Sequence, residues 1–166
     1  MKNVFALIVV PLLFSQTVQA KEDIGDMVTR IDRDCVLVSQ STDQDEDFKE
    51  LECKAFGGFQ LKISGSEGRF SPKISHSGFD VTLKDPDAPH DMASNEIKWI
   101  YAREYFPSGE GRLTWLGLMY ALKVGTEVQH YGVRLEKRMS CVIAISQDST
   151  AVMRAILNPS TPCEHY

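Results

Sequence analysis

The 166-residue chain lacks the patterns that mark nucleic-acid-binding and membrane-spanning proteins. It has no cluster of Lys and Arg, and its formal net charge is −5. Because neutralised phosphates supply most nucleic-acid affinity, this acidic balance argues against a nucleic-acid partner, and equally against binding to anionic lipid. The apolar stretch Val4–Phe14 contains Pro11 and is shorter than the roughly 20 residues that cross a bilayer. We therefore expect no nucleic-acid partner and no membrane insertion of the working protein.

Metal-binding patterns are also missing. The cysteines form no Cys-x-x-Cys pair, and no two histidines have the close spacing of ligands on one helix face. The acidic run Asp43–Asp47 begins like a calcium loop, but Phe48 stands where that loop requires glycine and Lys54 where it requires glutamate. Three aspartates surround His90 in the sequence, and a solvated Pro/Asp loop is favoured there over a weak metal site. We expect no metal and no cofactor.

The chain shows no nucleophile of the common hydrolases. The segment Ser64–Gly68 comes nearest to the Gly-x-Ser-x-Gly elbow, but it has serine where the first glycine belongs and no helical pattern after it. An even number of paired cysteines leaves no free thiol.

What is present begins with the layout of an export signal. Lys2 precedes the apolar stretch, and Val18-Gln19-Ala20 places small or aliphatic residues one and three positions before a signal-peptidase cut. We expect residues 1–20 to be removed as a signal peptide, leaving residues 21–166 as a single domain. Loss of Lys2 takes the formal net charge from −5 to −6. No cysteine lies near the cut to carry a lipid, so the sequence predicts a periplasmic or secreted protein.

Four cysteines remain after cleavage: Cys35, Cys53, Cys141 and Cys163. An even count in an oxidising compartment predicts two disulfides. Reflecting the chain about Gln44 places Cys35 opposite Cys53 and Leu37 opposite Leu51 on one face of a hairpin. Such cross-strand partners have Cβ atoms about 4.5–5.5 Å apart, close to what a disulfide requires. This register predicts a Cys35–Cys53 bond, which leaves Cys141 to pair with Cys163.

Most of the sequence alternates between apolar and polar residues, which is typical of strands with one buried face. The alternating apolar sets are Cys35/Leu37, Leu51/Cys53/Ala55, Phe59/Leu61/Ile63, Phe79/Val81/Leu83, Ile97/Trp99/Tyr101, Tyr131/Val133/Leu135 and Cys141/Ile143/Ile145. Gly57-Gly58 predicts a tight turn between two of these strands. A Pro-rich loop is expected over residues 85–95.

Two segments depart from the alternation and decide the fold class. Leu113–Val124 is apolar on both phases, so it is predicted to be a central strand covered on both faces. Near the C-terminus, Asp148 can cap a helix that Asn158, an αL-tolerant residue, and Pro159 end. The expected fold is mainly β (α+β): an antiparallel sheet, curled or doubled, with one C-terminal helix packed on it.

Aromatic residues gather around one predicted hairpin: Trp99, Tyr101, Tyr105, Phe106, Trp115 and Tyr120. Trp99 and Trp115 fall on buried phases. Tyr105 and Phe106 lie at the hairpin tip beside Pro107, where exposed aromatic residues often contact a partner. Tyr105 and Phe106 are the candidate binding residues.

Several local motifs resemble those of an uncharacterised family of small exported proteins from alphaproteobacteria. They are Cys53 followed by Phe56-Gly57-Gly58, the stretch Glu96-Ile97-Lys98-Trp99, and Cys141-Val142-Ile143-Ala144 before a helix and Cys163. The resemblance covers most of residues 21–166, although Glu67-Gly68-Arg69 replaces an Asp-Arg pair of that family. It implies a periplasmic setting and says little about activity.

Two hypotheses of function stay open. The first is a non-enzymatic envelope protein that binds a macromolecule or a cell-wall component, since no catalytic set is apparent. The alternative is a small hydrolase that uses carboxylates such as Glu104 and Glu110 as general acid and base. The hydrolase would require two carboxylates that face each other across a concave pocket, whereas a binding module would present an aromatic patch.

Overall fold

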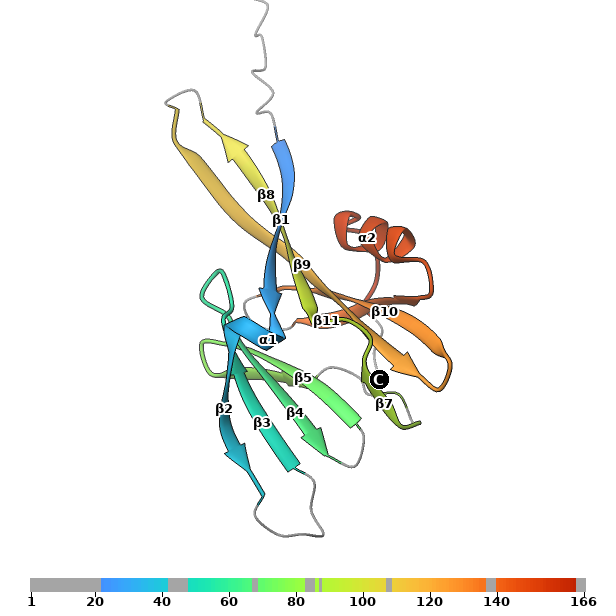
Figure 1. The fold of residues 1–166 in the computed structure, drawn as a ribbon. Coiled ribbons are helices and arrows are strands. Elements are labelled where there is room, and N and C mark those ends of the chain that lie inside the picture. Colours follow the sequence, from blue (N-terminus) through green and yellow to red (C-terminus); the bar gives the residue numbers. More distant parts are fainter. Residues whose placement is uncertain are drawn as a thin grey trace, which may run out of the picture.

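The computed structural model describes residues 22–41, 48–66, 69–82, 86, 88–106, 109–136 and 140–163. The predicted signal peptide and the acidic run at residues 43–47 lie outside the described residues. In chain order the elements are β1 (Glu22–Arg30), α1 (Ile31–Asp34), β2 (Cys35–Gln40), β3 (Phe48–Cys53), β4 (Gln60–Ser66), β5 (Arg69–His76), β6 (Phe79–Thr82), β7 (His90–Met92), β8 (Glu96–Tyr105), β9 (Gly111–Val124), β10 (Glu127–Arg134), β11 (Cys141–Ser146) and α2 (Ser149–Leu157). The fold is mainly β with one C-terminal helix packed on the strands, as predicted (Figure 1).

The strands form two antiparallel sheets, so the predicted sheet is doubled. One sheet has the order β1-β8-β9-β10-β11, with the short β7 also paired to β9, and the other runs β2-β3-β4-β5-β6. The single turn α1 carries the chain from the first sheet to the second. Strand β9 is central, as predicted, and its residues Gly117–Leu122 are buried on both phases. Its first residues, Gly111–Leu113, are exposed instead.

The elements stack in three layers. The main core lies between the two sheets and includes Leu61, Ile63, Ile74, Trp99, Leu118, Tyr120 and Leu122. Helix α2 covers the other face of the first sheet, away from the five-stranded sheet (Figure 1). Two glycines permit this close approach, since a Cβ at Gly117 would lie 2.6 Å from Ile156 Cγ2 and one at Gly132 would lie 2.7 Å from Val152 Cγ1.

The predicted disulfide pairing is confirmed. Cys35 is bonded to Cys53 and Cys141 to Cys163. Cys35 pairs opposite Cys53 and Leu37 opposite Leu51, as the reflection about Gln44 required. The register then shifts by one residue after Leu37, because a bulge interrupts the β2–β3 ladder.

Two turn predictions have different outcomes. Gly57 and Gly58 form the predicted tight turn, with φ values of +66° and +79° that favour glycine, and Phe59 N donates to Phe56 O at 3.1 Å. Asn158 ends α2 as predicted, but with φ −94° and ψ 106° instead of the left-handed conformation. The reason is Pro159, since a residue before proline is driven toward extended backbone.

The structure contains strands that the sequence did not predict. Strand β1 was missed because Thr29, which is buried in it, is a polar residue. Strand β5 was missed because Pro72 breaks the strand pattern; the described pairing of β6 with β5 ends at Lys73, so no described residue pairs with Pro72 on that side. The predicted loop over residues 85–95 contains β7, where His90 is only 2% exposed. Its Nδ1 lies 2.9 Å from Ala88 O and its Nε2 3.1 Å from Phe70 O, so the prediction of a solvated loop was wrong at this residue.

The cap of α2 makes the stability of the helix depend on pH. Asp148 Oδ1 accepts a hydrogen bond from Thr150 N at 2.8 Å, and this bond lowers the pKa of Asp148 below its ordinary value of 3.8. Stabilisation by the carboxylate is therefore fully present above about pH 4 and is lost as the pH falls through the lowered pKa. We expect Asp148→Ala to lower the urea midpoint at pH 7, and the gap from wild type to narrow at pH 2.

Asp148→Asn is the matched control, because an amide caps a helix about as well as a carboxylate and does not titrate. Its midpoint should stay close to that of wild type at pH 7. A gap between wild type and Asp148→Ala that is the same at both pH values would contradict the assignment.

Candidate functional site

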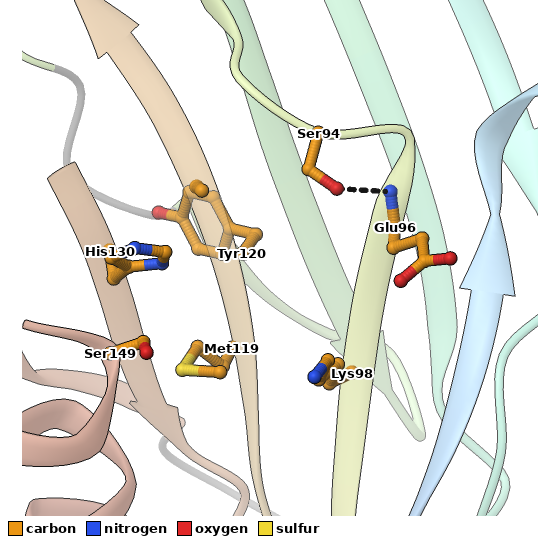
Figure 2. Close-up of a pocket in the computed structure, with 8 residues that line it drawn as sticks. Ser94, Glu96, Lys98, Met119, Tyr120, His130 and Ser149 are labelled. Carbon is orange, nitrogen blue, oxygen red and sulfur yellow. Dashed lines mark hydrogen bonds between the residues drawn. The ribbon is translucent and has the colours of Figure 1, made fainter. Parts of the chain in front are cut away.

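The first candidate site is a small pocket, lined by both polar and apolar residues, on the face of the first sheet that α2 covers. Figure 2 shows its lining, and its volume is about 140 Å³. The lining residues are Ser94, Glu96, Lys98, Met119, Tyr120, Ala121, His130 and Ser149. Ser94 Oγ accepts a hydrogen bond from Glu96 N at 3.1 Å. Residues His130 and Ser149 have the chemistry of a nucleophile and its base, but no described hydrogen bond joins them, and the volume is below the roughly 300–1,000 Å³ of ligand pockets.

The carboxylates of the hydrolase hypothesis lie near the end of the β8–β9 hairpin. Glu104 pairs across the ladder with Arg112. Glu110 is exposed at the tip, where its carbonyl accepts from Phe106 N at 3.0 Å. Neither residue lines the three cavities described here, and each of these cavities has at most one carboxylate in its lining.

The predicted aromatic tip is exposed. Tyr105 and Phe106 are 40% and 44% exposed, whereas Trp99 is fully buried and Trp115 half-buried, which is the order that the sequence predicted. The guanidinium of Arg103 lies 5.9 Å from the ring centroid of Tyr101, and its Nη1 is 3.5 Å from the Tyr105 hydroxyl. The bond to Tyr105 is the main contact that raises the pKa of Arg103. The β8–β9 hairpin therefore carries a permanently cationic group that contacts two tyrosines near its tip.

Two larger cavities adjoin each other along β9. The helix-side cavity, of about 570 Å³, is lined by Ile24, Thr114, Trp115, Leu116, Arg134, Leu135, Glu136, Ile156, Leu157 and Pro159. The sheet-side cavity, of about 400 Å³, is lined by Gly57, Phe59, His76, Arg112, Leu113, Thr114, Trp115 and Leu135. Three residues, Thr114, Trp115 and Leu135, line both, so the cavities adjoin along one stretch of β9. Both volumes fall within the range of ligand pockets.

Exposed apolar side chains gather at these cavities. Ile24 is 50% exposed, and Leu113 and Leu157 are each 38% exposed. Each of the three lines one of the two cavities. Since exposed apolar residues gathered at a site mark an interaction surface more often than scattered ones do, the pair of cavities is the stronger candidate site.

Trp115 lines both cavities and packs against other aromatic rings. Its ring stacks on Phe56 with centroids 5.5 Å apart and meets Tyr101 edge-on at 5.6 Å. The indole ring also lies so close to Gly57 that it leaves no room for a Cβ at that position. The indole is therefore positioned in advance, which lowers the entropy lost when a ligand binds.

Sequence reasoning found the aromatic tip but missed the cavities. Ile24, Leu135 and Leu157 come from three distant segments, and nothing in their local patterns relates them. The sequence carried only a weak signal of the site: Leu113 and Trp115 are apolar residues of the strand predicted to be covered on both faces. In the structure, both side chains are partly exposed instead.

Two further findings concern the described residues. No group of three or more His, Cys, Asp or Glu among them is arranged to hold a metal ion. None of their helices has the length and apolar character to cross a membrane.

Comparison of the chain with protein-family models, curated proteins and solved structures finds no match.

Proposed function

We propose that this protein is a non-enzymatic binding protein of the bacterial envelope, exported to the periplasm or secreted, and that its ligand is a macromolecule or a cell-wall component. The observation that carries the proposal is the pair of adjoining cavities beside Trp115, of which the helix-side one is mainly apolar, with exposed Ile24, Leu113 and Leu157 in their linings. The two disulfides support an oxidising compartment, and the predicted signal peptide and the family resemblance agree with that setting.

A binding role fits the chemistry of the cavities better than a catalytic one. The helix-side cavity is lined mainly by aliphatic and aromatic side chains, whereas the lining of the sheet-side cavity is about equally polar and apolar. The charged residues Arg112, Arg134 and Glu136 lie among them. A carboxylate hydrolase requires an acid and a base close to the same bond. Glu104 and Glu110 lie outside the three cavities, so the alternative has less support.

The test is capture from an envelope extract with the full exported chain immobilised, followed by mass spectrometry. We expect wild type to retain a component that Leu113→Asp and Leu157→Asp lose, because a carboxylate at either cavity cannot be buried against an apolar ligand without a large penalty. Both leucines are 38% exposed, so the substitutions should leave the fold intact. Val36→Asp is the matched control, since Val36 is 63% exposed and lies on β2 in the other sheet.

Two outcomes would contradict the proposal. One is a retained set that is the same for wild type and both cavity variants. The other is turnover of a cell-wall or peptide substrate that Glu104→Gln or Glu110→Gln abolishes, which would support the hydrolase instead.

A further inference from the structure

We infer that the cavities take an extended peptide of a partner protein, which adds as a strand to the free edge of β9 and places alternate side chains in the two cavities. This inference rests on the proposed binding function and names the class of its ligand. The free edge is defined as residues Gly111–Trp115.

The first observation is that, among the described residues, no strand pairs with the outer side of this edge of β9. β8 pairs with Gly111–Trp115 on one side, and β1 continues the sheet beyond β8. On the other side β10 pairs with β9 only from Gly117 to Val124. Beyond that point, Leu135 N donates to Leu116 O at 3.1 Å, and no backbone hydrogen bond to the outer side of the free edge occurs among the described residues. In Figure 1, β8 and β9 continue past β10 as an arm.

The second observation is that hydrogen bonds join Glu136, which follows β10, to Ser140, which precedes β11. Glu136 N donates to Ser140 Oγ at 3.3 Å, and Ser140 Oγ donates back to Glu136 O at 3.2 Å. Beside them, the last residue of β10, Arg134, pairs with the first residue of β11, Cys141. Alternate residues of the free edge direct their N–H and C=O groups away from β8, to a side where no backbone partner lies among the described residues. An extended peptide backbone is the complement of such a row.

The third observation is that the two cavities flank this row on opposite faces of the sheet. The helix-side cavity includes Ile156, Leu157 and Pro159 at the end of α2. The sheet-side cavity includes Phe59 and His76 of the five-stranded sheet. Because successive side chains of a strand point to opposite faces, an added strand would place one apolar side chain in each cavity in turn.

Charge further specifies the peptide. Arg112 lies near the outer end of the free edge, and Arg134 lies two residues beyond its inner end, opposite Gly117. Within the described part of the chain, Arg112 forms no ion pair. The charged lining of the two cavities is thus two arginines and one glutamate, in a chain whose net charge is −5. An apolar peptide with a carboxylate beside Arg112 fits best.

Strand β2 is a second exposed edge, and it provides the internal comparison. Val36, Leu37 and Val38 are 63%, 53% and 46% exposed, and β3 is the one strand that pairs with β2 in the described part of the chain. None of these three residues lines a cavity described here. Backbone complementarity alone would not distinguish β2 from β9, whereas side-chain pockets favour β9.

The experiment selects random seven-residue peptides, displayed on phage, against the immobilised exported chain, and then uses one enriched synthetic peptide. We expect enriched sequences to be apolar on both phases with an Asp or Glu at one end, and Arg112→Gln to remove the preference for the acid. Binding should protect amides of Gly111–Trp115 from hydrogen exchange. Leu113→Asp should weaken binding by about tenfold or more, and Val36→Asp should leave it unchanged.

A backbone test separates strand addition from simple apolar binding. Two versions of the peptide, N-methylated on one or the other set of alternate amides, should differ, because only one set faces the free edge. Equal affinity of the two versions, protection at Val36–Val38 instead, or no enriched peptide would overturn the inference. If envelope capture still depends on Leu113 and Leu157 in that case, the proposed function stands and only the peptide class fails.

Discussion

Replacing Thr29 with valine is expected to lower the free energy of unfolding by about 2–3 kcal/mol, although valine has nearly the same shape. Thr29 is fully buried, and its hydroxyl connects the two sheets. Trp99 Nε1 donates to Thr29 Oγ1 at 2.9 Å, and Thr29 Oγ1 donates to Lys54 O, just beyond β3, at 2.7 Å. The valine variant leaves both partners without their bond, and a buried polar group without a partner costs about 1–3 kcal/mol.

Urea unfolding followed by tryptophan fluorescence would measure the loss. Thr29→Ser is the matched control, since serine keeps the hydroxyl and removes only a methyl group, at a cost of about 1 kcal/mol. If the valine variant proves as stable as the serine variant, the hydroxyl does not connect the sheets in the way described.

Loss of the Cys141–Cys163 bond is expected to lower the free energy of unfolding by about 3 kcal/mol, because the bond closes a loop with a sequence separation of 22 residues and restricts the unfolded chain. This is a large share of the roughly 5–15 kcal/mol that stabilises a domain. The bond also fixes the chain beyond α2, whose last turn forms a wall of the helix-side cavity. The double variant Cys141→Ser with Cys163→Ser should therefore also speed hydrogen exchange of the α2 amides.

The double variant Cys35→Ser with Cys53→Ser provides the comparison. Its loop separation is 18 residues, so the loss of stability should be similar, but the α2 amides should keep their protection in the folded state. Similar hydrogen exchange of α2 in both double variants would show that the Cys141–Cys163 bond does not hold the helix in place.

Much of the fold could be predicted from local patterns. The Cys35–Cys53 pairing followed from a reflection that put two cysteines and two leucines on one face, because a strand's side chains alternate with a strict period of two. The central position of β9 followed from apolar residues on both phases. The ends of α2 followed from Asp148 and Pro159, which act within one turn of the helix.

Where prediction failed, the residue type did not match its environment. Thr29 is polar and buried, because its hydroxyl has partners on distant segments. Gly25 in β1 offers no apolar side chain, and a Cβ there would lie 2.5 Å from the Tyr101 hydroxyl. His90 is buried for a similar reason, with ring nitrogens close to carbonyls of two separate segments. Local patterns carry no information about such partners.

The sequence by itself determined the class of fold, the disulfide pairs, the two-glycine turn and the exposed aromatic tip, because each depends on residues that are close along the chain or share a strict period. Only the tertiary structure decided the candidate site. The cavities lie where β9 continues to Gly111 beyond its ladder with β10, which ends at Gly117, and where the end of α2 comes close to β9. The relative lengths of paired strands and the place where a helix docks are set by packing between distant segments, which no local pattern records.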